Sequence, residues 1–141
     1  MNTSSRFAVA VHILTLLAYR EGHPVTSESV ADSVNTNPVV IRRVLGALRD
    51  ANLVTSQTGP GGGWRLARRP DAITLRDAYR AVEVDTLFPL PQRAPNPACP
   101  VGRTIQRSLE RVFRETEAAL DSQLARTTVA TMLEGARTPA P

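Results

Sequence analysis

Three short helical segments followed directly by two short strands constrain the fold of this chain most. The third segment begins at Asn37-Pro38, a favourable cap followed by a favourable first helical residue. Its apolar residues recur at i, i+3, i+4 and i+7, which predicts one buried face: Ile41, Val44, Leu45 and Leu48. Weaker helical patterns precede it, after Ser4 or Ser5 and after Thr26 or Ser27. For the first of these, the spacing predicts an inward stripe of Phe7, Val11, Leu14 and Ala18.

The two strands are predicted at 53–57 and 64–67, on either side of the glycine-rich stretch Thr58–Gly63. A phosphate-binding nucleotide loop would require a Lys after the glycines. The chain has none, because all 17 of its basic residues are Arg. A plain hairpin needs only one or two glycines, whereas a wing that approaches a sugar–phosphate backbone uses several. The pattern therefore predicts a mainly α fold with a small β-hairpin, a winged helix-turn-helix.

The second half of the chain predicts a loop and a long helix. Thr74, with Asp77 three residues later, is a weak capping-box pattern for a fourth helix. Five of the eleven prolines lie in 86–100, which excludes a helix there. The apolar stripe of the following helix needs a partner, most simply a second copy: Val101, Ile105, Leu109, Val112, Phe113, Leu120 and Leu124.

The expected organisation has four parts. A winged helix-turn-helix occupies 1–85, and a proline-rich loop with Cys99 occupies 86–100. A dimerisation helix and a short terminal helix around Val129 and Leu133 fill 101–135, and 136–141 is a tail.

Arginines on the third helix are the candidate DNA-reading residues. Burial of the apolar face turns Val39, Arg42, Arg43, Gly46 and Arg49 outward. Arg can donate two hydrogen bonds to guanine in the major groove, and the amino end at Asn37 can meet a phosphate. Arg65 adds charge beside the wing. The alternative is that these arginines only solvate an exposed helix face.

Several classes of protein are excluded or disfavoured by the composition. The single Cys99 excludes an intrachain disulfide and an all-Cys metal site, and it favours a reducing cytoplasm. The apolar segment Phe7–Tyr19 is too short to span a membrane and lacks a signal-cleavage pattern. No catalytic constellation is present, so we do not expect an enzyme. The pI near 10.5 permits an anionic partner.

Four stretches of the chain resemble the Rrf-two (Rrf2) family of bacterial winged-helix transcriptional regulators. They are Arg6-Phe7-Ala8-Val9, Asn37-Pro38-Val39-Val40-Ile41-Arg42-Arg43, Gly59-Pro60-Gly61-Gly62-Gly63-Trp64 and Ile73-Thr74-Leu75-Arg76-Asp77-Ala78-Tyr79-Arg80-Ala81-Val82-Glu83. The resemblance implies a homodimer joined through the helix 101–126 and bound to double-stranded DNA at a partly palindromic operator. It places Val39, Val40, Arg42 and Arg43 in the base-contacting stretch.

The same resemblance adds Arg6 at the start of the first helix and Thr58, Gly61 and Gly62 in the wing as candidate DNA-binding residues. Many family members have a basic residue that enters the minor groove where this chain has Thr58. Minor-groove recognition by the wing is therefore expected to be weaker here.

The sensing site is the part of the resemblance that this chain departs from. Members that bind an iron–sulfur cluster carry three cysteines where this chain keeps one, so we expect no cluster and no other cofactor. His12 and His23 could be proposed as substitute ligands, but we expect them to be structural. If Pro100 begins the long helix, the helix dipole and Arg103 favour a Cys99 thiolate. The alternative is a small residue packed beneath the proline-rich loop.

These observations predict a dimeric, sequence-specific DNA-binding transcriptional regulator in the cytoplasm. We expect a repressor, controlled through thiol oxidation of Cys99 or by a small ligand. An alternative is a winged-helix protein-interaction module that does not read DNA. A small enzyme or metal carrier is a third possibility.

Overall fold

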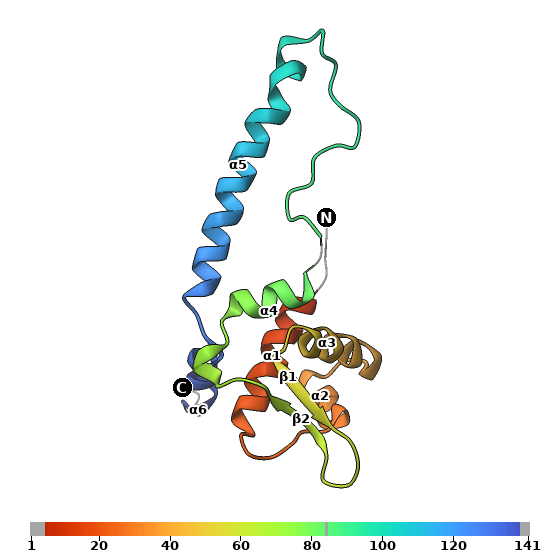
Figure 1. The fold of residues 1–141 in the computed structure, drawn as a ribbon, viewed down its shortest axis with the longest axis vertical. Helices are drawn as coiled ribbons and strands as arrows, with labels where there is room; N and C mark the ends of the chain where they lie inside the picture. Colours follow the sequence, from red (N-terminus) through yellow and green to blue (C-terminus); the bar gives the residue numbers. More distant parts are fainter. Residues whose placement is uncertain (1–4, 84, 139–141) are drawn as a thin grey trace. The chain divides into compact units, whose positions relative to one another are not determined.

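The computed structural model describes residues 5–83 and 85–138, which form two compact units (Figure 1). The first unit contains the described residues up to 83 together with 124–138, and the second contains 85–123. The fold is mainly helical with one two-stranded antiparallel hairpin, as the sequence predicts. Within the described residues, no helix combines the length and apolar character needed to cross a membrane.

Three helices build the first half of the first unit: α1 (Arg6–Tyr19), α2 (Ser27–Val34) and α3 (Pro38–Asp50). Side-chain caps begin the second and third. Thr26 Oγ1 accepts the Ser29 N–H at 3.1 Å, and Asn37 Oδ1 accepts the Val39 N–H at 2.8 Å. Asn35 adopts the left-handed conformation that ends α2, with φ 58°. The tight turn between α2 and α3 is therefore encoded by polar residues at both of its ends.

The core lies between α1 and the helices packed around it. All four predicted inward residues of α3 are at most 1% exposed. The predicted stripe of α1 is only half right, because Leu14 and Ala18 are buried but Phe7 and Val11 are half-buried on another face. α1 is apolar on all sides, so its spacing does not define a single inward face. Its buried residues are Val9, Ala10, Ile13, Leu14, Leu17 and Ala18.

The hairpin pairs β1 (Val54–Gln57) with β2 (Gly63–Leu66), in a register that sets Ser56 opposite Trp64. Two backbone bonds between Val25 and Trp64, at 3.0 and 2.8 Å, tie the segment before α2 to β2. Gly63 allows this close approach. Its φ is +146°, and an added Cβ would lie 2.8 Å from the Val25 carbonyl oxygen. The hairpin is thus attached to the helical body by its backbone.

Three further elements close the first unit: the 3-10 helix η1 (Pro70–Ala72), α4 (Leu75–Val82) and α6 (Val129–Arg137). The Thr74 hydroxyl accepts the Asp77 N–H at 3.1 Å, and the Asp77 carboxylate accepts the Thr74 N–H at 2.9 Å, so the capping box is complete. α6 packs against α1 and η1, with Val129 and Leu133 in the core. The sequence analysis grouped the terminal helix with the long helix in 101–135, whereas its apolar residues lie in the first unit. α6 also extends into the expected tail, of which 139–141 lie outside the described residues.

The second unit consists of the proline-rich loop and most of α5 (Pro100–Ala125). Phe88 of the loop stacks on Phe113 of α5 with ring centroids 5.1 Å apart. No residue of α5 is buried. The long stripe predicted as one surface is therefore divided: Phe113 is covered by the chain's own loop, whereas Val101 and Val112 are 66% and 49% exposed.

Candidate nucleic-acid interface

The outward face of α3 presents charge above a fully buried opposite face. Arg42, Arg43 and Arg49 are exposed, and Val39 is 47% exposed at the amino end of the helix. Asn37 is a candidate phosphate contact whose side chain already caps the helix. A contact at this end would therefore use backbone N–H groups.

A second part of the predicted set meets on the side of α3 nearest the start of α1. Arg6, Val40 and Arg43 line one cavity of about 220 Å³, together with Val44, Ala47 and Val82. Val40 is half-buried and packs against the core, so it offers less surface to a base than Val39 does. The structure thus brings Arg6 to α3, which sequence distance alone does not indicate.

Arg49 connects α3 to the hairpin. Its guanidinium carbon lies 5.8 Å from the centre of the Trp64 ring, within the range of a cation–π interaction. Arg49 is therefore partly engaged in holding the hairpin beside α3. Arg42 and Arg43 have the more open positions on the helix.

The wing tip, residues 58–62, is exposed except at Gly62, which is half-buried. Gly61 has φ +76°, which favours glycine. At Gly62 an added Cβ would overlap the Gln57 carbonyl oxygen, so the turn itself requires this glycine. The geometry of the loop accounts for these glycines without a close approach to DNA.

Arg65 lies apart from the other candidates. It borders a groove of about 320 Å³ that continues onto the end of α1 and the loop after β2. We call this the basic groove; its charged or titratable lining residues are Arg20, Glu21, His23, Arg65, Arg68 and Arg69. The sequence analysis selected only Arg65 among its arginines, because the others are distant in sequence and follow no motif.

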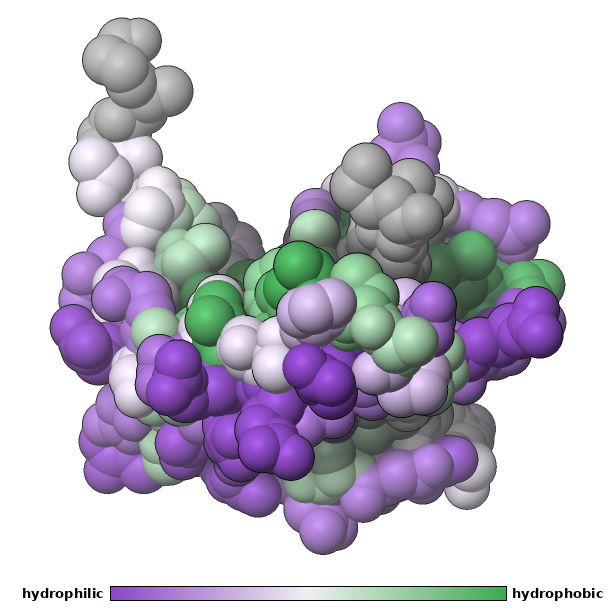
Figure 2. Space-filling model, turned by 90° about the horizontal axis from the view of Figure 1, so that it is seen from above, coloured by the Kyte–Doolittle hydropathy of each residue, from purple (hydrophilic) through white to green (hydrophobic). Residues whose placement is uncertain are grey.

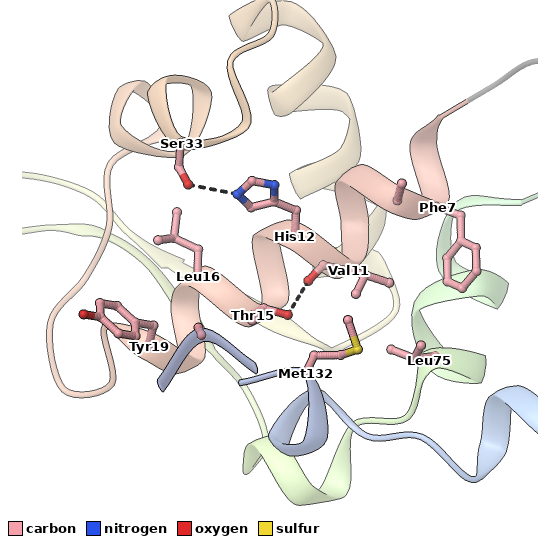
Figure 3. Close-up of a pocket in the computed structure, with 11 residues that line it drawn as sticks. Phe7, Val11, His12, Thr15, Leu16, Tyr19, Ser33, Leu75 and Met132 are labelled. Atoms are coloured by element: carbon pink, nitrogen blue, oxygen red, sulfur yellow. Dashed lines mark hydrogen bonds between the residues drawn. The ribbon is translucent and has the colours of Figure 1, made fainter. Parts of the chain in front are cut away.

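An apolar groove of about 710 Å³ covers the other face of α1, between α2, α4 and α6 (Figure 3). Phe7, Val11, Leu16 and Met132 line it. His12 points into the region beside α2, where its Nε2 lies 2.9 Å from Ser33 Oγ. This contact supports a structural role for His12. Elsewhere on the surface, Figure 2 shows apolar patches scattered among hydrophilic residues on the face that it draws.

Cys99 lies in the second unit and is exposed, which contradicts packing beneath the proline-rich loop. It immediately precedes Pro100, the first residue of α5. Hydrogen bonds from the backbone N–H groups of Gly102 and Val101 lower the pKa of its thiol. The expected direction is thus found, but its cause is the backbone at the helix start and not the Arg103 side chain.

Taken together, a capped helix-turn-helix, an outward arginine face and an adjoining wing define a winged-helix DNA-binding regulator. The chain matches the family model Rrf2, described as an iron-dependent transcriptional regulator, over residues 3–135. It belongs to the Rrf2 family of transcriptional regulators, which are not enzymes.

Relatives of known sequence and structure agree with this assignment. YwnA of Bacillus subtilis (strain 168), which carries the name of an HTH-type transcriptional regulator, is 44% identical over 123 residues, covering 86% of this chain and 90% of that relative. A crystal structure described as a DNA binding protein is 39% identical with a TM-score of 0.74, covering 92% of this chain and 99% of that one. The structure of CymR, the global cysteine regulator of B. subtilis, is 27% identical with a TM-score of 0.66, covering 95% and 97%.

The residues of this chain do not fit the iron dependence in the family description. Across 5–83 and 85–138, no three His, Cys, Asp or Glu side chains come together as metal ligands. Cys99 is the single cysteine of the sequence. We therefore assign no step of its regulation to iron.

Proposed function

We propose that this protein binds a partly palindromic operator as a homodimer, and that the outward arginines of α3 read bases in the major groove. The observation that carries the proposal is the exposed Arg42 and Arg43 on a helix whose opposite face is entirely buried. Such a helix is held firmly by the core while it presents bidentate donors to guanine. Val39 adds an apolar contact at the end that enters the groove first.

Dimerisation through α5 is supported by its exposed apolar residues. Val101, Ile105 and Val112 are 66%, 38% and 49% exposed, and they recur along one side of the helix. Pairing two copies through this side would remove the residues from water. Two recognition helices would then lie about 34 Å apart, one helical turn of DNA.

Regulation is proposed to be repression in the cytoplasm, released when Cys99 is oxidised. The lowered pKa of its thiol and its exposure favour reaction with a peroxide. In that step the thiolate attacks a peroxide oxygen, the O–O bond breaks, and sulfenic acid and hydroxide form. Unchanged operator affinity after oxidation, or the same response in Cys99→Ser, would exclude this control.

The test of DNA reading is a salt series with the reduced protein, a labelled fragment of its own promoter region and scrambled competitor. Arg42→Ala and Arg43→Ala should each cost roughly 1–3 kcal/mol of binding free energy and relax base preference. Arg137→Ala, an exposed arginine at the end of α6, is the matched control and should change neither. Salt-independent binding, or no binding at low salt, would support the protein-interaction alternative.

A further inference from the structure

We propose that the basic groove binds phosphates of DNA flanking the operator half-sites, and so extends the contact beyond α3 and the wing tip. This inference rests on the proposed DNA-binding function. Its residues come from the end of α1, the loop before α2, β2 and the loop after β2. None of its arginines except Arg65 is among the residues predicted from sequence to contact DNA.

The first argument is charge. Four arginines line the groove, with Glu21 as the opposing carboxylate in the lining. Two of these arginines have acidic partners just outside it: Arg69 lies 3.0 Å from Asp71, and Arg68 lies 3.8 Å from Asp77.

Arg20 and Arg65 differ from that pair. Neither forms an ion pair within the described residues, and both are exposed. Positive charge of this kind is complementary to a phosphate, and each arginine can give a phosphate two parallel hydrogen bonds.

The second argument is rigidity. Arg20 ends α1, and its carbonyl accepts the His23 N–H at 2.9 Å in a tight turn. Two residues later, Val25 is bonded to Trp64, the neighbour of Arg65 on β2. The backbone therefore fixes the loop that carries Arg20 and His23 beside the strand that carries Arg65, so little order must be gained on binding.

The third argument is direction. Successive side chains of a strand point to opposite faces, and Trp64 is the residue that meets Arg49 of α3. Arg65 therefore points to the face of the hairpin turned away from Arg49. A duplex contacted by α3 and the wing would reach the basic groove only where it continues past the hairpin, which places the contact in flanking DNA.

The test compares wild-type protein with the double variant Arg20→Gln/Arg65→Gln on two duplexes, a long promoter fragment and one trimmed to the two half-sites. On the long duplex the variant should bind about three- to tenfold more weakly at 0.1 M salt, with a salt slope lower by about 1 per lost phosphate contact. Its preference for promoter over scrambled DNA should not change, because phosphates carry no base identity. On the trimmed duplex the two proteins should bind equally.

Two controls separate charge from structure. Arg20→Lys/Arg65→Lys keeps the positive charge and should retain most of the wild-type salt slope. Arg137→Gln removes an arginine elsewhere in the same unit and should leave both duplexes unaffected.

Equal affinity and slope for wild-type and glutamine variant on the long duplex would overturn the inference and assign the groove to another partner, such as an acidic protein surface. An equal loss on both duplexes would overturn the flanking position. If wild-type protein bound neither duplex, the proposed function itself would fail.

Discussion

Replacement of Leu133 by Ala should destabilise the entire first unit, although Leu133 lies on the terminal helix, far in sequence from the hairpin. Leu133 is 5% exposed in the core shared with α1. Leu→Ala removes three carbon-sized groups worth about 0.8 kcal/mol each, and the remaining cavity raises the cost to about 3 kcal/mol. With a urea m-value of about 2 kcal/mol/M, the unfolding midpoint should fall by about 1.5 M.

The assay is equilibrium urea unfolding followed by the fluorescence of Trp64, the only tryptophan, at one fixed protein concentration. Trp64 lies on β2, so its signal reports whether loss of a contact in α6 destabilises the hairpin. Glu134→Ala, the exposed neighbour on the same helix, should stay within about 0.5 kcal/mol of wild type. A Trp64 midpoint that Leu133→Ala leaves unchanged would refute the assignment of α6 to this core.

Three further perturbations test local features. Thr74→Ala removes the capping box of α4 and should lower the free energy of unfolding by about 1 kcal/mol in the same urea assay, with no change as the contradicting result. Gly63→Ala should destabilise the hairpin because its Cβ would press on the Val25 carbonyl, whereas Gly135→Ala, with open space in α6, should stabilise by up to about 1 kcal/mol; equal effects would contradict the backbone argument. The Cys99 thiol should titrate, in the rate of alkylation by iodoacetamide, below the ordinary cysteine pKa of about 8.5, so thiolate persists at lower pH. Urea-unfolded protein is the control, and identical profiles would count against the helix-start effect.

The helix-turn-helix could be predicted from the sequence because its determinants are local. Asn37-Pro38 starts α3 through a side-chain bond two residues long, and the Thr74 box closes over three residues. The apolar spacing of α3 also predicts its buried face correctly, since polar residues occupy the remaining positions. Periodicity identifies the inward face only of a helix that has a polar one.

The same rule explains what could not be predicted. α1 is apolar all round, so only the packing of α3, α4 and α6 decides which side is core and which side borders the apolar groove. The basic groove joins Arg20 to Arg65, 45 positions apart, through the backbone bonds of Val25 with Trp64, and no spacing rule encodes that pairing.

The local sequence by itself determined the caps, the turn, the glycine-dependent hairpin and the outward arginines of α3, because each depends on atoms a few residues apart. Only the tertiary structure decided that α6 completes the first core, that Arg49 binds Trp64, and that Arg6 lies beside Arg43. These depend on contacts between distant segments, which form because burying apolar surface favours one packing of the whole unit.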